Sequence, residues 1–236
     1  MQTAPDLLQI AALASEAGLI HGFSTLAIGS VGLTHAPDPH AALSARRAFA
    51  RRLGVDADTL TVAGAVHGAK VARVLEPWEV IQGVDGLVTD RPGLGLFATF
   101  ADCYPILLWD RAKKCVALAH AGWRGTHAGV AAEAARVMRE DYGCRDIVAG
   151  IGPGICGRCY EVGAEVASKF DARFVTAGHG DRFLLDLAAA NRAGLEEAGV
   201  REVHVLGVCT KESDFLPSHR REPDGARFGA IVAIHA

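Results

Sequence analysis

Residues 101–125 read ADCYPILLWDRAKKCVALAHAGWRG, and this stretch decides how the centre of the chain folds. Two apolar runs of strand length, PILLWD and CVALAH, are separated by only the four residues RAKK. A parallel connection needs a dozen or more residues, so the two strands can pair only as an antiparallel hairpin. Folding about the middle of the turn sets Pro105 opposite His120, with Cys103 beside the same open end of the hairpin.

Further apolar runs of strand length lie on both sides of this hairpin. TVAGAVH, AKVARVL, DGLVTD and GLGLFATF precede it, and DIVAGIG, EVHVLGV and RFGAIVAIHA follow it. Patterns typical of helices cover residues 38–54, 126–143, 160–170 and 187–199. Strands dominate the middle of the chain and helices flank them, which predicts an α/β (α+β) fold with a large mixed sheet.

The composition bounds the class of protein. Of 236 residues, 50% are hydrophobic and 22% are charged, and no linker or repeat divides residues 1–236, so we expect a single domain with a buried core. The net charge is −3 without a basic stripe, which argues against a nucleic acid or an anionic membrane surface as partner. The start, MQTAPDLLQI, lacks the features of a secretory signal, and six cysteines are too few for a disulfide scaffold. We therefore expect a cytoplasmic protein with free thiols and no membrane span.

Cys103, His120 and a third residue, His67, form the candidate site. Facing residues of an antiparallel pair have Cα atoms about 4.5–5.5 Å apart, and His67 ends the run TVAGAVH before a glycine, where side chains project into clefts. Two His and one Cys are the donor set of a catalytic zinc ion whose fourth position is open to water or substrate. Alternatively, Cys103 is a nucleophile whose proton His120 removes. In a third interpretation Cys103 is a small buried hydrophobe and the histidines are core residues, and spacing does not decide among the three.

Seven motifs carry a resemblance to a known family. In chain order they read AVHGAKV, DGLVTD, ADCYPILLWD, HAGWRGTHAGV, IGPGICGRCYEVG, FLLDLAAANRAGL and FLPSHRRE. In order and spacing this series resembles the multicopper polyphenol oxidase, or laccase-domain, family, whose members are also described as purine nucleoside phosphorylases. The resemblance runs from about His21 to the C-terminus. It implies a single domain of α/β/β/α layers with mixed sheets, and zinc bound by His67, Cys103 and His120, which would then be the catalytic residues.

The resemblance also implies a set of activities. Members phosphorolyse adenosine, guanosine, inosine and methylthioadenosine and deaminate adenosine, so a purine nucleoside and phosphate are the expected small-molecule partners. The alternatives are an amidase or cysteine hydrolase that edits peptidoglycan precursors, a copper-dependent polyphenol oxidase, and a metal-dependent binding protein. Zn²⁺ is favoured over copper because a multicopper oxidase needs many histidines, commonly as His-x-His pairs. The chain has ten histidines and no such pair.

Residues near this set predict a substrate pocket. Gly122 would let the backbone approach a ligand closely, and Arg124 offers phosphate a planar cation beside the helix expected to start near Thr126. Alternatively, Arg124 pairs with a surface carboxylate. Arg221 in SHRRE and Cys159 in CGRC are further candidates to line the pocket and bind substrate.

Two acidic residues and two departures from the family pattern bear on the same pocket. Asp85 and Asp102 either orient an imidazole or cap turns, and for Asp85 a turn cap is favoured. CGRC is a single pair of cysteines without a partner pair, so no metal is predicted there. The usual HGFxTRxGG of the family reads HGFSTLAIGS, with Leu26 in place of the arginine, and FxSYRR reads FLPSHRR, with His219 in place of the tyrosine. The two departures fall on pocket elements and therefore bear on the preferred nucleoside, not on metal binding.

Overall fold

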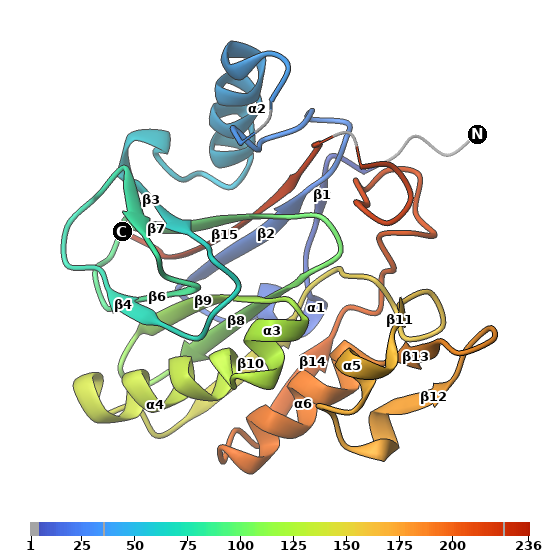
Figure 1. Ribbon diagram of the computed structural model, residues 1–236. Helices are drawn as coiled ribbons and strands as arrows, with labels where there is room; N and C mark the ends of the chain where they lie inside the picture. Colours follow the sequence, from blue (N-terminus) through green and yellow to red (C-terminus); the bar gives the residue numbers. More distant parts are fainter. Residues whose placement is uncertain (1–4, 35, 224) are drawn as a thin grey trace.

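Two six-stranded sheets lie face to face in the computed structural model, which describes residues 5–34, 36–223 and 225–236 (Figure 1). The first sheet has the order β1 (Leu7–Leu8), β2 (Leu19–Ser24), β15 (Phe228–Ile234), β7 (Gly95–Phe100), β3 (Leu60–Gly64) and β5 (Val80–Gln82). The second has the order β14 (Glu202–Val205), β10 (Ile147–Ile151), β8 (Tyr104–Asp110), β9 (Cys115–Ala121), β6 (Gly86–Thr89) and β4 (Val71–Arg73). A smaller sheet contains β11 (Glu161–Val162), β13 (Phe183–Leu185) and β12 (Val175–Ala177).

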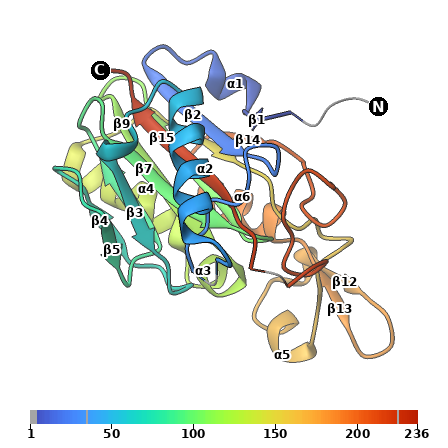
Figure 2. The same cartoon turned by 90° about the horizontal axis from the view of Figure 1, so that it is seen from above.

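Helices cover the outer faces of the two large sheets. Figures 1 and 2 show α2 (Pro39–Arg52) across the first sheet, and Figure 1 shows α4 (Val130–Tyr142) and α6 (Leu187–Glu197) beneath the second. Both sheets combine parallel and antiparallel pairs. The layers therefore run α/β/β/α with mixed sheets, which confirms the predicted fold class. None of the helices in the described part of the chain is long and apolar enough to cross a membrane.

Alternation along β9 assigns each of its side chains to one interface. Ala117 and Ala119 pack in the core between the second sheet and its helices, whereas Val116 and Leu118 pack in the core between the two sheets. His120 continues the series of Val116 and Leu118, and it is buried. The period of two thus sets the imidazole of His120 at the end of the interface between the two sheets.

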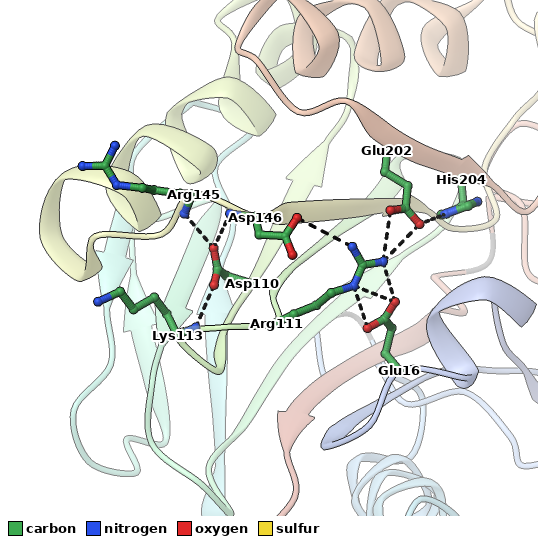
Figure 3. Close-up of polar contacts among 8 residues, drawn as sticks. All are labelled: Glu16, Asp110, Arg111, Lys113, Arg145, Asp146, Glu202 and His204. Atoms are coloured by element: carbon green, nitrogen blue, oxygen red, sulfur yellow. Dashed lines mark hydrogen bonds and ion pairs between the residues drawn. The ribbon is translucent and has the colours of Figure 1, made fainter.

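The predicted hairpin is formed by β8 and β9, and Pro105 lies directly opposite His120. The buried carboxylate of Asp110 holds its turn by accepting the backbone N–H groups of Lys113, Arg145 and Asp146 at 2.7–2.8 Å (Figure 3). These bonds join the hairpin turn to the start of β10. Three accepted N–H groups give this buried carboxylate a structural role.

A second contact fixes the same end of the hairpin. The guanidinium of Arg111 donates to the carboxylates of Glu16 and Glu202, and it lies 3.7 Å from that of Asp146 (Figure 3). Glu202 also contacts the imidazole of His204 at 2.9 Å. The arrangement ties the hairpin to β14 and to the segment that follows α1 (Ala11–Ala14).

The predicted helices agree with the structure except at two places. The helix expected over residues 126–143 is divided, because Gly129 adopts the left-handed φ of 77° between α3 (Trp123–His127) and α4. The helix expected over residues 160–170 is wrong. Its first residues instead form β11, which pairs with β13, and only the four-residue α5 (Ala164–Ala167) is helical. Pairing in the smaller sheet overrides the local helical pattern there.

Candidate metal centre

His67 lies in the loop after β3 and has a backbone φ of 62°. The buried Asp85 carboxylate accepts the backbone N–H groups of Val66, His67 and Gly68, the last two at 2.7 Å. These bonds hold the loop in a conformation that non-glycine residues rarely adopt. The carbonyl oxygen of Asp85 also accepts the N–H of His120 at 2.7 Å. Asp85 is therefore the predicted turn cap, and it positions the backbones of both histidines.

Cys103 is presented by a turn that its neighbour Asp102 stabilises. Asp102 has a φ of 83°, and its carboxylate accepts the Thr210 hydroxyl at 2.6 Å and the Arg220 N–H at 2.7 Å. The carbonyl oxygen of Asp102 accepts the N–H of Ile155 at 2.9 Å. Both carboxylate oxygens thus hold loops from elsewhere in the chain, and Cys103 is left half-buried, facing a cavity.

His120 has an imidazole with unused polar atoms. Its ring stacks on Phe100 of β7 at a centroid distance of 4.6 Å and meets His67 edge to face at 5.1 Å. Only 6% of its surface is exposed, and among the described residues neither Nδ1 nor Nε2 has a hydrogen-bond partner. Buried polar atoms are normally paired, because an unpaired one costs about 1–3 kcal/mol. An unpaired imidazole nitrogen facing a second histidine and a thiol is what a metal site requires.

The structure brings the three candidate donors together. Ligand atoms of His67, Cys103 and His120 all lie within 4.8 Å of one another, and the three residues range from exposed to buried. In a zinc site, nitrogen and sulfur ligands lie about 2.0–2.3 Å from the ion, so their mutual separations are about 3.3–3.8 Å. Small side-chain rotations therefore suffice to bring these donors onto one divalent ion. His67 and Cys103 also line a cavity, so an ion held by these donors would be accessible from it.

The electrostatics of the site favour a ligand role for Cys103 over that of an autonomous nucleophile. Burial, reinforced by the charge of Asp102, raises the pKa of the Cys103 thiol to about 12. Burial also lowers the pKa of His120 to about 3, with the charges of His67 and Arg227 adding to the fall. A thiol this weakly acidic beside an imidazole this weakly basic does not form an ion pair at neutral pH. A divalent cation reverses this balance, because a coordinating thiol is deprotonated outright.

Gly122 leaves space for the side chains of Cys103 and His67. A Cβ atom built on Gly122 would lie 2.6 Å from Sγ of Cys103 and 3.1 Å from Cδ2 of His67. Both distances are below ordinary van der Waals contact. Glycine at this position therefore lets the backbone after β9 pass close to both Cys103 and His67.

A cavity of about 160 Å³ lies beside the three donors. His67, Cys103, Trp123, Arg124 and Tyr160 are among its lining residues. The guanidinium of Arg124 lies 4.4 Å above the Trp123 ring, and no carboxylate of the described residues pairs with it within 4.0 Å. The helix next to this cavity, α3, has only five residues, so its dipole adds little to the positive charge of Arg124 there.

Two other predicted pocket residues lie elsewhere. Arg221 donates from its guanidinium to the carbonyl oxygens of Thr210, Lys211, Ser213 and Leu216 at 2.7–3.2 Å. These bonds hold the guanidinium against the loop of residues 210–216. Cys159 of the CGRC motif does not line the cavity either. Its side chain lies in a group of three thiols and one carboxylate.

Sequence reasoning missed three residues at the site. Phe100 stacks on His120, and Tyr160 lines the cavity beneath the guanidinium of Arg220, 5.1 Å from the ring centroid. The positive charge of Arg227 opposes the rise in the pKa of Cys103 and adds to the fall in the pKa of His120. An isolated arginine before the last apolar run has no local pattern that marks it. Only the return of β15 to the middle of its sheet brings it here.

The two departures from the family pattern lie on the surface. Leu26 is 39% exposed, and its backbone N–H donates to the carbonyl oxygen of Phe215 at 2.9 Å. His219 is also exposed. Relative to the family pattern, Leu26 removes a positive charge and His219 removes a phenol near residues 215–220. Neither change alters the three donors.

Comparison with known proteins agrees with this geometry. The family described as multi-copper polyphenol oxidoreductase laccase matches residues 20–235. A purine nucleoside phosphorylase of Deinococcus radiodurans is 39% identical over 208 residues, covering 84% of this chain and 79% of that protein. A protein named adenosine deaminase RL5, from an unknown prokaryotic organism, is 37% identical over 181 residues, covering 70% of this chain and 69% of its own.

Solved structures agree as well. YlmD from Geobacillus stearothermophilus superposes with a TM-score of 0.92 at 28% identity, covering 100% of this chain and 98% of that one. The hypothetical protein YfiH of Bacillus licheniformis gives a TM-score of 0.89 at 27% identity, covering 98% and 97%. Sequence and structure together show that the chain belongs to the multi-copper polyphenol oxidoreductase laccase family.

Proposed function

We propose that the chain is a zinc-dependent purine nucleoside phosphorylase that also cleaves methylthioadenosine and deaminates adenosine. The observation that carries the proposal is the buried, unpartnered imidazole of His120 beside His67 and Cys103, at a cavity that Arg124 also lines. The names of the relatives support purine nucleosides as the substrate class.

His67, Cys103 and His120 would hold the ion, and Zn²⁺ suits a set of two imidazoles and one thiolate. When bound, the ion supplies Lewis acidity and lowers the pKa of coordinated water. Phenol oxidation coupled to four-electron reduction of oxygen requires several coppers, and this donor set would hold one ion. The donor set therefore suits Lewis-acid or hydrolytic chemistry better than the phenol oxidation that the family description names.

In phosphorolysis a phosphate oxygen forms a bond to C1′ of the ribose while the bond from C1′ to the purine N9 breaks. The electron pair leaves with the base, which takes up a proton. Arg124 would bind and orient the phosphate, because its guanidinium presents paired N–H donors to two oxygens. The rings of Trp123 and Tyr160 line the cavity and would exclude water from one side of the base.

Deamination of adenosine uses the same site without phosphate. Water adds to C6 of the purine, ammonia leaves, and inosine forms. The neutral state of the buried His120 imidazole, whose pKa is lowered to about 3, suits a ligand that keeps its lone pair for a cation. One site can therefore serve two reactions that differ in the attacking oxygen.

The test is incubation of the zinc-loaded protein with adenosine, inosine or methylthioadenosine, with and without phosphate, read by chromatography. Free base that forms only with phosphate supports phosphorolysis, and inosine formed from adenosine supports deamination. C103S should abolish both reactions, whereas C144S, a matched change at a buried thiol outside the site, should not. If the loaded protein forms neither product, the purine proposal is overturned.

A further inference from the structure

A second group of metal-binding side chains lies outside the site described above. Ligand atoms of Cys156, Cys159, Cys209 and Glu212 all lie within 4.8 Å of one another. The first two come from the loop between β10 and β11, and the other two come from the segment that follows β14. We call these four residues the CCCE cluster.

The backbone presents the four side chains in two short turns. Both turns have the spacing of zinc-binding turns, Cys-x₂-Cys in the first and Cys-x₂-Glu in the second. In the first turn the N–H of Cys159 donates to the carbonyl oxygen of Cys156 at 2.9 Å. The two turns are joined by a parallel bridge between Gly154 and Cys209. They are therefore held face to face by backbone bonds that do not depend on the side chains.

The distances suit a tetrahedral ion. Sulfur ligands lie about 2.3 Å from zinc, so the edges of a tetrahedral thiolate site are about 3.8 Å long. Donor atoms within 4.8 Å of one another need to close by at most about 1 Å, which side-chain rotation provides. Cys159 already contacts a Glu212 oxygen through its thiol at 3.4 Å.

The surroundings also suit a charged site. The N–H of Cys156 donates to Sγ of Cys209 at 3.3 Å, which stabilises sulfur as an acceptor. Nε of Arg158 donates to the Glu212 carboxylate at 2.8 Å and supplies a positive charge next to three thiols. Cys209 is 6% exposed, so its sulfur is shielded from solvent. Three thiolates and a carboxylate form a closed set of four ligands without an open position for substrate.

We propose that the CCCE cluster binds a structural divalent metal ion, with Zn²⁺ the chemically favoured occupant. Soft thiolate donors in tetrahedral arrangement select zinc over the harder cations Mg²⁺ and Ca²⁺. The proposal does not depend on the purine activity, because it concerns other residues and another role.

The cluster is linked to the first site through Asp102. Thr210, the neighbour of Cys209, donates its hydroxyl to the Asp102 carboxylate, and Ile155, the neighbour of Cys156, donates its N–H to the Asp102 carbonyl oxygen. An ion that joins the two turns would fix both of these donors. The CCCE residues are therefore positioning residues for the loop that presents Cys103, and none of them lines the cavity of the first site.

Elemental analysis of the purified full chain, prepared without chelator and with its affinity tag removed, tests the proposal. We expect two zinc ions per chain in the wild type and one in C209S, with C144S retaining both as the matched thiol control. H67A should also retain one ion, held by the CCCE cluster. Cobalt substitution supplies a second readout, because H67A should keep the sulfur-to-cobalt charge-transfer absorption of a multi-thiolate site and C209S should lose most of it.

The outcomes separate the two metal proposals. Loss of one zinc ion in C209S, with one ion retained in H67A, supports the CCCE site. Zinc binding at the first site is refuted separately if H67A binds as many zinc ions as the wild type does. An ion content that C209S leaves unchanged overturns the CCCE proposal, as does a Cys156–Cys159 disulfide in protein purified under reducing conditions. If C209S does not fold, the metal content of E212Q and the alkylation of wild-type cysteines test the CCCE proposal instead. Cys156 and Cys159 should resist iodoacetamide until chelator is added, and immediate labelling of both overturns the proposal.

Discussion

Substitution of Gly122 by alanine probes the first site most directly. The new Cβ atom would lie 2.6 Å from Sγ of Cys103, whereas ordinary contact begins near 3.5 Å, so the thiol must move by about 1 Å. It would also lie 3.1 Å from Cδ2 of His67. One methyl group therefore pushes on two of the three donors at once.

The expected loss follows from the tolerance of metal coordination. Ligand distances are held to within about 0.2 Å, so a displacement of about 1 Å removes one bond or distorts the site. We expect the affinity for zinc to fall by about 100-fold, which corresponds to about 2.7 kcal/mol. Overpacking should also lower the free energy of unfolding of the metal-free protein by about 1–3 kcal/mol.

Chelator competition gives the zinc affinity, and urea unfolding of the metal-free protein gives the stability. The matched control is G194A, since Gly194 lies inside α6 and an added Cβ meets nothing within 4 Å. This control should bind zinc normally and should be more stable by up to about 1 kcal/mol. If G122A binds zinc as tightly as G194A does, the argument from the close approach of Gly122 to Cys103 is refuted.

Three further predictions concern phosphate, acid stability and the hairpin turn. R124A should raise the KM for phosphate at least about tenfold, with partial recovery in R124K, because a charge-assisted hydrogen bond is worth about 1.5–3 kcal/mol; an unchanged KM in initial-rate assays would contradict the assigned role. Burial lowers the pKa of His21 from 6.5 to about 4, and its Nε2 accepts the Ile10 N–H at 3.0 Å. The stabilisation by neutral His21 is complete above pH 6.5 and is lost as the pH falls towards 4, by up to about 3 kcal/mol in the free energy of unfolding. H21Q should flatten that part of the profile in urea titrations, and an equally steep fall in the variant would count against it. D110N should cost about 2 kcal/mol in the same titrations, since an amide NH₂ would face backbone donors, and an unchanged midpoint would rule out the structural role of the Asp110 carboxylate.

The central hairpin and the proximity of Cys103 to His120 were predictable because local rules decide them. A connection of four residues forces antiparallel pairing, and that pairing fixes the register that sets Pro105 opposite His120. Alternation then assigns the imidazole of His120 to the face between the sheets. His67 was identified by its place before a glycine and by the family resemblance, whereas the hydrogen bonds that the Asp85 carboxylate accepts from its loop are visible only in the structure.

Other features depend on contacts between distant segments, which a single sequence does not reveal. The CGRC pair had no visible partner, because Cys209 and Glu212 lie about fifty residues further along the chain and reach it through one bridge. The strand at residues 161–162 exists because β13 pairs with it, although the local pattern is helical. Propensity is a weak guide wherever such pairing competes with it.

The location of His120 between the two sheets has a thermodynamic consequence. An ion bound there touches β9 of one sheet and loops attached to the other, and the unfolded chain does not hold these donors together. Ion binding and sheet docking are therefore linked equilibria, and free zinc at one hundred times its Kd would stabilise the native state by about 2.7 kcal/mol. Scarcity of the ion would thus lower the population of docked, folded protein, in addition to any effect on the proposed activity.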